Sequence, residues 1–279
     1  MNIAIIVPNP NFAGPNIRKN LLDIGRWTEE KEFDSHPVYR KTSGHHDVRL
    51  FTTDKNCLEL DHYDKLIVSF GFKLGALIIA TTHRSAAGTP SFTVHPIGNW
   101  TDDASFGGEP NMVTATPARL MRACLDALIK CNATEHLVTM EATHHGPILT
   151  SPTMFIEIGS DEVAWKTPEF GKIIAMALLD VIDHPLKEYP IAFGIGGPHY
   201  CPNFLSIMRK SGYAIGNICA KYGLEGLDEN KILDAMKKSD ASSILLDWKG
   251  LGKHKDRIVA ILEQNKIEYM KTMDVKVEL

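Results

Sequence analysis

Short apolar runs recur along the whole chain, and patterns typical of amphipathic helices separate several of them. Many of these runs are continuously apolar rather than alternating, as in strands that are buried on both faces of a sheet. The runs expected to form strands are 3–7, 48–52, 65–70, 76–81, 91–94, 137–142, 154–159, 191–194, 213–219, 243–247 and 267–270. This order predicts an α/β protein, namely a three-layer αβα sandwich with a mixed, mostly parallel sheet.

Three of the expected helices begin at clear N-terminal signals. Thr116 and Thr167 each precede a proline, which is favoured at the first helical position, and Asp228 is a typical helix cap. The expected helices are 16–27, 116–130, 167–183, 228–238 and 253–264. Because no repeat, low-complexity tract or linker interrupts this order, we expect a single domain over residues 1–279.

Length, charge and cysteine content exclude several classes of protein. A chain of 279 residues can bury a sufficient core without disulfides or a structural metal. The formal net charge of −4 excludes a wholly basic nucleic-acid coat, although it leaves room for a local basic patch. Five cysteines without a CxxC pair favour a reducing, cytoplasmic location. No run reaches the ~18 apolar residues of a membrane helix, so we expect no membrane association.

The sequence holds twelve histidines, and four groups of them follow expected strands. The groups are 82–85 with His83 and Arg84, 94–99 with His95 and Asn99, 141–147 with Glu141, His144, His145 and Gly146, and 194–200 with Gly196, Gly197, His199 and Tyr200. A lone histidine is more often structural, but α/β folds bind ligands at strand ends, and four groups there predict a shared site. Since neighbours on an extended chain point in opposite directions, we expect at most one of the two adjacent histidines to face it.

Two carboxylates accompany these histidines. Glu141 lies just before the histidine pair, and Glu157 lies in an apolar strand where a solvent-facing position is equally compatible with the pattern. Histidines with carboxylates are typical of zinc sites that activate water, and equally of metal-free acid–base hydrolysis. The sequence has no HExxH, no GxSxG and no kinase motif, which argues against those enzyme classes.

Glycine-rich and basic segments are candidates for contact with an anionic substrate. The turn at Gly196 and Gly197 exposes backbone N–H groups, although it matches neither GxGxxG nor a P-loop. Arg84 could hold a phosphate or a carboxylate. The segment 248–257, with Lys249 and Lys253, could contact a phosphate backbone, whereas charge alone slightly favours a solvated helix start.

Taken together, the segments 82–85, 94–99, 142–147 and 194–200 resemble the archaeal and plant type of D-aminoacyl-tRNA deacylase. The resemblance runs from residue 1 to about residue 255. It implies hydrolysis of the ester between a D-amino acid and the 3′ adenosine of tRNA, on an αβα sandwich related to phosphorylase/hydrolase-like proteins. It also implies zinc as a cofactor, the tRNA acceptor end as partner, and no stable protein partner.

On this basis we assign expected roles to the site residues. The expected catalytic residues are His83, Glu141, His144 and His199. The expected metal ligands are His95, His145 and Glu157. The expected substrate- and tRNA-binding residues are Arg84, Asn99, Gly146, Gly196, Gly197, Tyr200, Lys249 and Lys253. Among them, the backbone N–H groups around the three glycines are candidates for binding the oxyanion or the terminal phosphate.

Three other functions remain compatible with the sequence. A zinc-dependent peptidase or amidohydrolase would use the same histidines, but its activity would not depend on tRNA. A phosphate-dependent nucleoside-processing enzyme would use Arg84 and the glycine turn, and it would require phosphate. A non-enzymatic RNA-binding module would leave the histidine groups without a role.

Overall fold

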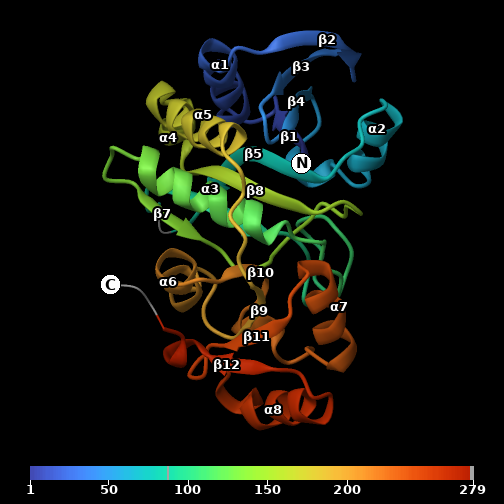
Figure 1. The fold of residues 1–279 in the computed structure, drawn as a ribbon, viewed down its shortest axis with the longest axis vertical. Coiled ribbons are helices and arrows are strands. Elements are labelled where there is room, and N and C mark those ends of the chain that lie inside the picture. The colour runs from blue at the N-terminus through green and yellow to red at the C-terminus, as the bar shows by residue number, and fades with distance from the viewer. Residues whose placement is uncertain (87, 277–279) are drawn as a thin grey trace.

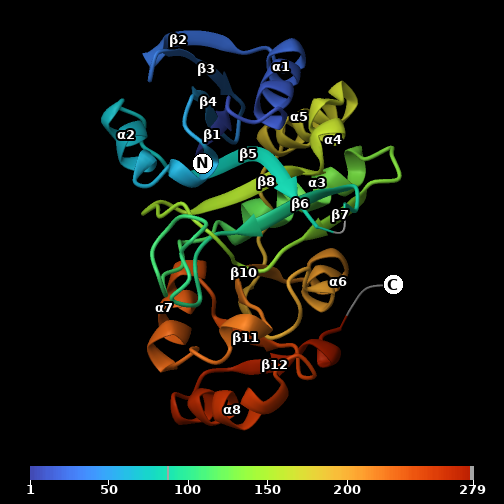
Figure 2. The ribbon, with the colours of Figure 1, turned by 180° about the vertical axis from the view of Figure 1, so that it is seen from behind.

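The computed structural model describes residues 1–86 and 88–276, whose strands form two sheets (Figures 1 and 2). The strands of the larger sheet are β1 (Asn2–Pro8), β2 (Thr28–Phe33), β3 (His36–Thr42), β4 (Asp47–Thr53), β5 (Ala76–Arg84), β6 (Ser91–Pro96), β7 (Leu137–Met140) and β8 (Thr153–Ser160). Their order is β2-β3-β4-β1-β5-β8-β6-β7. The smaller sheet has the order β10-β9-β11-β12, with β9 (Ile191–Ile195), β10 (Ala214–Cys219), β11 (Ser243–Leu246) and β12 (Tyr269–Lys271).

The larger sheet is mixed and the smaller one is parallel. Strands β4, β1, β5 and β8 run parallel to one another, whereas β2 and β3 form an antiparallel hairpin beside β4. Strand β6 is antiparallel to β8 and parallel to β7. All pairs in the smaller sheet are parallel. The prediction of a mixed, mostly parallel sheet is therefore confirmed, with the addition that a second sheet is present.

Helices cover both faces of each sheet. They are α1 (Ala13–Gly25), α2 (Tyr63–Ser69), α3 (Ala118–Cys131), α4 (Glu162–Lys166), α5 (Pro168–Asp183), α6 (Pro202–Lys210), α7 (Glu229–Ser239) and α8 (Lys255–Gln264). On the larger sheet, α1, α3 and α5 pack on one face and α2 on the other. On the smaller sheet, α6 lies on one face and α7 and α8 on the other. This arrangement confirms the three-layer αβα prediction.

Alternation along β1 explains how a continuously apolar strand is buried on both faces. Ile3 and Ile5 belong to the core beneath α1, α3 and α5, whereas Ala4 and Ile6 belong to the core beneath α2. Successive side chains of a strand point to opposite faces, so an apolar run of this kind requires two covering layers. Helix α3, which lies on the larger sheet, also packs against β10 of the smaller sheet. This contact joins the two sheets.

One expected strand is wrong, and several elements lie where none was expected. The run 65–70 lies mostly in helix α2, because Tyr63 and Ile67 are buried one helical turn apart while Leu66 and Val68 are exposed. The charged hairpin β2–β3 and the helices α4 and α6 were not expected. Most other expected elements match the observed ones to within about three residues, as is usual for element ends.

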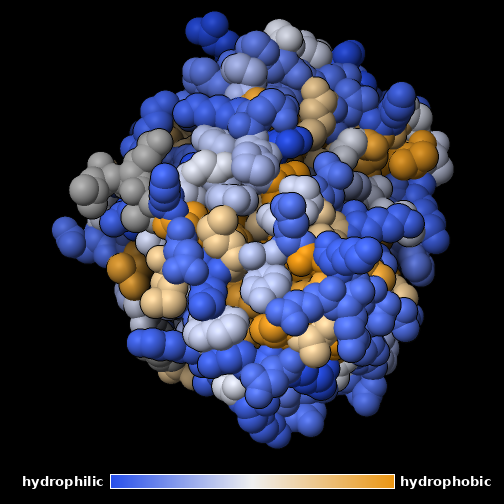
Figure 3. Space-filling model, turned by 60° about the horizontal axis from the view of Figure 1, so that its bottom comes forward, coloured by the Kyte–Doolittle hydropathy of each residue, from blue (hydrophilic) through white to orange (hydrophobic). Residues whose placement is uncertain are grey.

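The helix caps follow the sequence signals only in part. The Asp228 carboxylate accepts the N–H of Lys231 as predicted. Thr116 and Thr167 make no capping bond through their side chains, and α3 begins only after Pro117. No helix among the described residues is long and apolar enough to cross a membrane. The face in Figure 3 is largely hydrophilic, with apolar side chains in small groups.

Candidate active site

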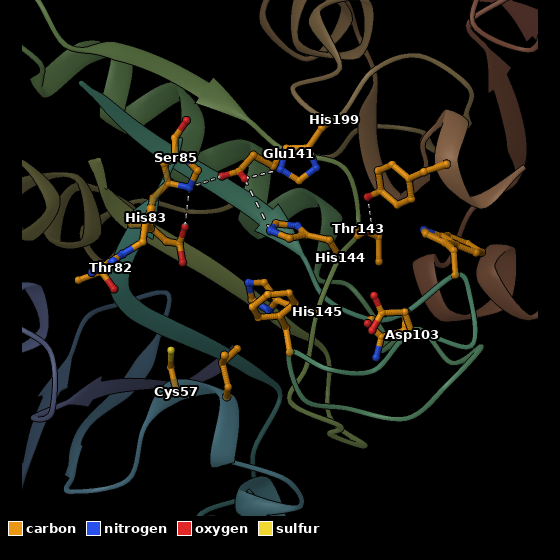
Figure 4. Close-up of a pocket in the computed structure, with 18 of the residues that line it drawn as sticks. Cys57, Thr82, His83, Ser85, Asp103, Glu141, Thr143, His144, His145 and His199 are labelled. Atoms are coloured by element: carbon orange, nitrogen blue, oxygen red, sulfur yellow. Dashed lines mark hydrogen bonds and ion pairs between the residues drawn. The ribbon is translucent and has the colours of Figure 1, made fainter. Parts of the chain in front are cut away.

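A cavity of about 750 Å³ opens where the two sheets meet (Figure 4). Its walls come from the carboxyl end of β5, the loop 98–106 after β6, the segment 141–145 after β7, and the loop after β9 that carries His199 and Tyr200. All four expected histidine groups contribute residues to this cavity or to the layer directly behind it. The prediction that they share one site therefore agrees with their placement in the fold.

Glu141 lies at the centre of the site, directly after β7. Its carboxylate is buried and lies within 3.6 Å of three imidazoles. Oε2 accepts a hydrogen bond from His199 Nε2 at 2.8 Å and lies 3.6 Å from His144 Nε2, while Oε1 lies 3.2 Å from His83 Nδ1. A buried carboxylate requires such partners, because its charge is costly to desolvate.

Glu157 faces the same site from the middle of the sheet. The register places it beside Thr81 of β5 and Thr93 of β6, so His83 and His95, two residues further along, share its face. Its carboxylate accepts a hydrogen bond from Thr93 Oγ1 at 3.2 Å, and it lies 3.6 Å from both His83 Nδ1 and His95 Nε2. The side chain is buried, so the solvent-facing alternative for this glutamate is wrong.

His144 and His145 both reach the cavity, contrary to the expectation that at most one would. His145 adopts a left-handed backbone conformation with φ of 43°, so the two side chains no longer alternate as they would on a strand. The His144 ring centroid lies 4.3 Å from that of His95 and 4.3 Å from that of His145. The three imidazoles thereby surround one small volume, with their ring planes tilted or edge-on to one another.

Burial and charge divide these histidines into two classes. Burial lowers the pKa of His83 and of His95, but the two glutamates outweigh this effect and raise both pKa values above their ordinary range. Burial and the neighbouring imidazoles lower the pKa of His144 strongly, and that of His145 to about 4. His83 and His95 therefore favour the charged form, whereas His144 and His145 stay neutral at pH 7.

The donor set fits a zinc ion. Among the described residues, three groups have donor atoms within 4.8 Å of one another: His95 with His144 and His145, Glu141 with His144 and His199, and His83 with Glu141 and Glu157. Buried Glu141 Oε1 and His95 Nε2 also lack a hydrogen-bond partner. Neutral imidazoles and carboxylates are typical zinc ligands. The expected metal trio of His95, His145 and Glu157 is divided between two of these groups.

Three of the expected substrate-binding side chains line the cavity. Arg84 is exposed, with its guanidinium 5.1 Å from the centroid of the Trp165 ring. The Tyr200 hydroxyl lies 3.2 Å from His83 Nε2. The Asn99 side chain points back into its own loop, because its Nδ2 donates to the carbonyls of Gly107 and Glu109.

Two of the three glycines use the N–H groups that were expected to face the substrate for bonds within the protein. The N–H of Gly146 donates to the Phe106 carbonyl and that of Gly196 to the Cys219 carbonyl. A Cβ at Gly197 would lie 2.7 Å from an Asp247 carboxylate oxygen, so this position serves close packing. Neither Gly196 nor Gly197 lines the cavity. The N–H groups of Gly146 and Gly196 are thus engaged within the protein, and a role of the three glycines in binding the oxyanion or the terminal phosphate stays a prediction.

The two expected tRNA-binding lysines lie away from the cavity. Lys249 lines a separate groove of about 260 Å³ beside Trp248. Lys253 is exposed, and its ammonium lies 3.1 Å from a carboxylate oxygen of Glu225. Any contact of these lysines with a substrate in the cavity would thus have to be made by a distant part of a large ligand.

Several cavity residues were not anticipated from the sequence. Tyr222 donates from its hydroxyl to the Thr143 carbonyl at 3.1 Å, and Cys57 enters from the loop before α2. Neither has a local sequence signal, since each is brought to the cavity by tertiary packing. Asn11 did carry a signal, because it follows β1 as the histidine groups follow their strands; its Nδ2 donates to Thr81 Oγ1 at 2.8 Å.

Comparison with known proteins identifies similar sequences over most of the chain. Residues 70–270 match the family model described as D-aminoacyl-tRNA deacylase. The D-aminoacyl-tRNA deacylase of Methanosarcina barkeri is 32% identical over 98% of this chain and 90% of the relative. That of Archaeoglobus fulgidus is 31% identical over 98% of this chain and 97% of the relative.

A solved structure is similar over the whole of this chain. The crystal structure of a conserved protein of unknown function superposes with a TM-score of 0.89 at 30% identity, over 100% of this chain and 98% of that one. The family model covers all four histidine groups, from 82–85 to 194–200. The chain belongs to the D-aminoacyl-tRNA deacylase family.

Proposed function

We propose that this protein hydrolyses the ester bond of D-aminoacyl-tRNA and releases the free D-amino acid and the tRNA. The observation that carries the proposal is the buried Glu141 carboxylate, which lies within 3.6 Å of three imidazoles at the cavity. Hydrolysis of an ester needs a water nucleophile, a group that takes its proton, and stabilisation of the oxyanion. The site offers candidates for each of these requirements.

His199 is the proposed base. Because its Nε2–H donates to Glu141, its Nδ1 carries the lone pair that can accept a proton from water. The water oxygen then attacks the ester carbonyl carbon, and the bond from that carbon to the ribose 3′ oxygen breaks. His199 returns the proton to this leaving oxygen. Glu141 holds the imidazole in the required tautomer and stabilises its charged form, as a buried carboxylate does in other hydrolases.

His83 and Tyr200 are the proposed stabilisers of the oxyanion. The glutamates raise the pKa of His83, which favours a cation, and the Tyr200 hydroxyl lies 3.2 Å from its Nε2. A hydroxyl polarised by a neighbouring cation is a stronger hydrogen-bond donor. These side chains are proposed for the role that was first expected of the glycine N–H groups.

His95, His144 and His145 are the residues that would hold zinc, with Glu157 beside His95. The ion would supply a Lewis acid that polarises the carbonyl and lowers the pKa of water. The raised pKa of His95 describes the protein without an ion, since a cation nearby would favour its neutral form. With His95 neutral, the neighbouring Glu157 and His145 hold its ring in position.

We also infer that the two sheets act as one catalytic unit. Glu141 comes from the larger sheet and His199 from the smaller one, and the N–H of Ala142 donates to the His199 carbonyl at 2.8 Å. Tyr200 is proposed to contact the terminal adenosine, Arg84 a phosphate next to it, and Lys249 and Lys253 the more distant acceptor stem. A tRNA substrate and free cysteines suit a cytoplasmic location.

The experiment that tests this function compares D-Tyr-tRNA with L-Tyr-tRNA as substrates. The protein is first analysed for metal, and each assay is run with and without a zinc chelator. Selective loss of the D-ester supports the proposed function, and sensitivity to chelator supports zinc in the reaction. If zinc-loaded protein hydrolyses neither ester, the proposal fails, and a peptidase or amidohydrolase becomes the better interpretation.

A further inference from the structure

One rim of the cavity combines aromatic and cationic side chains. This Phe12 rim consists of Asn11, Phe12, Arg84, Trp165 and Lys166, from the loop before α1, the end of β5 and helix α4. Asn11 and Arg84 line the cavity itself. The Arg84 guanidinium lies 5.1 Å from the Trp165 ring centroid, and Lys166 Nζ lies 3.8 Å from the Phe12 ring centroid. The rim is therefore continuous with the proposed active site.

Phe12 is exposed without a packing reason. Its side chain is 48% exposed, and among the described residues it belongs to none of the apolar core clusters. The loop that carries it is nevertheless fixed, because Asn11 donates to Thr81 Oγ1 and accepts the N–H of Gly14. An exposed aromatic ring beside a substrate cavity offers a flat apolar face on which a planar group can stack.

Arg84 gives this rim a cation beside the cavity. Its guanidinium lines the cavity, whereas Lys166 is paired with Glu162, and Asp161 is engaged as the cap of α4. The opposite wall carries the Asp103 carboxylate, well separated from His83 and Ser85 (Figure 4). A phosphate backbone that leaves the cavity on this side would meet the Arg84 guanidinium, and its next phosphate would compete with Glu162 for Lys166.

We propose that the Phe12 rim binds the unpaired nucleotides that precede the terminal adenosine of the tRNA substrate. This inference rests on the proposed function, which places the ester beside Glu141 and His199. One base stacks on the Phe12 ring, and the adjoining phosphates contact Lys166 and Arg84. Single-stranded RNA is bound in this way, by aromatic rings for the bases and cations for the backbone.

The test compares two D-tyrosyl esters: D-Tyr-tRNA and 3′-O-D-tyrosyl-adenosine 5′-monophosphate, which lacks the preceding nucleotides. Phe12→Ala should lower kcat/KM on the tRNA ester at least about fivefold more than on the short ester, since base stacking contributes that much. Phe12→Tyr, which keeps an aromatic ring, should restore kcat/KM on the tRNA ester. Leu66→Ala is the matched control, because Leu66 is 49% exposed on α2, away from the cavity, and should change neither value.

A salt series supplies a second readout. Lys166→Gln should reduce the slope of log kcat/KM against log salt concentration on D-Tyr-tRNA by about 0.7, the value for one phosphate contact in a single strand. If Phe12→Ala lowers kcat/KM equally on both esters, or lowers neither, the Phe12 rim does not bind the preceding nucleotides. The same conclusion follows if Lys249→Ala lowers kcat/KM on the tRNA ester alone and Phe12→Ala does not. Failure of the wild type on both esters would instead remove the proposed function itself.

Discussion

The Nε2 of His199 donates a 2.8 Å hydrogen bond to the Glu141 carboxylate, and this bond connects the two sheets of the molecule. Glu141 follows β7 at the edge of the larger sheet, whereas His199 follows β9 in the smaller one. The pair therefore exists only when both sheets are folded and in contact. A buried carboxylate that orients a partly exposed imidazole is well suited to fix one tautomer for proton transfer.

Glu141→Gln should lower kcat on D-Tyr-tRNA by about 10²- to 10⁴-fold, the range that general acid–base catalysis contributes. The amide keeps the shape of the side chain but cannot stabilise the charged form of His199. The check is steady-state kinetics together with circular dichroism. Glu32→Gln, at an exposed position of β2, is the control that should behave as wild type. A normal kcat in Glu141→Gln would contradict the central role given to this carboxylate.

His199→Ala should abolish measurable turnover and lower the melting temperature by a few degrees. The His199 side chain is 36% exposed, so its removal leaves only a small cavity, but it also removes a hydrogen bond to the buried Glu141 carboxylate. Single-turnover deacylation and thermal unfolding measure the two effects separately. Tyr200→Phe keeps the adjacent ring and should retain more activity than His199→Ala. The reverse order would assign the larger role to the hydroxyl.

Part of this site could be predicted from the sequence, because α/β folds bind ligands at the ends of strands. His83 and His95 lie at the ends of β5 and β6, and Glu141 and His199 follow β7 and β9, so strand ends mark all four as candidates. Because β6 is antiparallel to β8 and β9 belongs to the smaller sheet, their meeting at one cavity also depends on the tertiary arrangement. The left-handed backbone at His145 could not be anticipated, because adjacent histidines on an extended chain diverge. Tyr222 and Cys57 reach the cavity only through tertiary packing.

The fold was predictable to a similar extent. Buried strands and capped helices carry strong local signals, so the αβα layers followed from the pattern of the sequence. The run 65–70 was misassigned because its three consecutive apolar residues satisfy either period, and only burial of Tyr63 with Ile67 selects the helix. The division of the strands into two sheets depends on pairing between distant segments, which no local pattern specifies.

Asn99→Ala should raise KM for D-Tyr-tRNA severalfold with a smaller effect on kcat. Asn99 donates two hydrogen bonds, to Gly107 and Glu109, and so holds the loop that forms one wall of the cavity. Each bond contributes about 1 kcal/mol, so their loss should loosen this wall. Faster amide hydrogen exchange in 101–111 would show the loosening directly. Unchanged exchange would assign Asn99 a direct contact with substrate instead.

His144→Ala should reduce the zinc content of the purified protein and the rise in melting temperature on adding zinc. His144 belongs to two of the three possible metal groups, so its loss affects more arrangements than any other histidine. Elemental analysis and thermal unfolding with and without zinc measure these effects. His184→Ala is the control, since this histidine is exposed and lies in none of the groups. Equal zinc content in both variants would place the metal elsewhere.

The stability of the metal-free protein should fall as pH decreases from about 6.5 to 4. The pKa of His145 is about 4 in the folded state, lowered chiefly by burial, so the unfolded chain binds the proton first. The slope from this group is at most about 1.4 kcal/mol per pH unit, and it ends below pH 4. His83 and His95 act oppositely, because their pKa values are raised and their stabilisation is lost as pH rises.

Urea unfolding of wild type and His145→Asn between pH 4 and 8 separates the two effects. The variant removes one of the two site histidines with a lowered pKa and leaves His144 in place, so its free energy of unfolding should fall less steeply with acid than that of the wild type. Above pH 7 both curves should run in parallel, because His83 and His95 are unchanged. Identical slopes in acid would mean that His145 is protonated in the folded protein, and that it would then be a poor ligand for zinc.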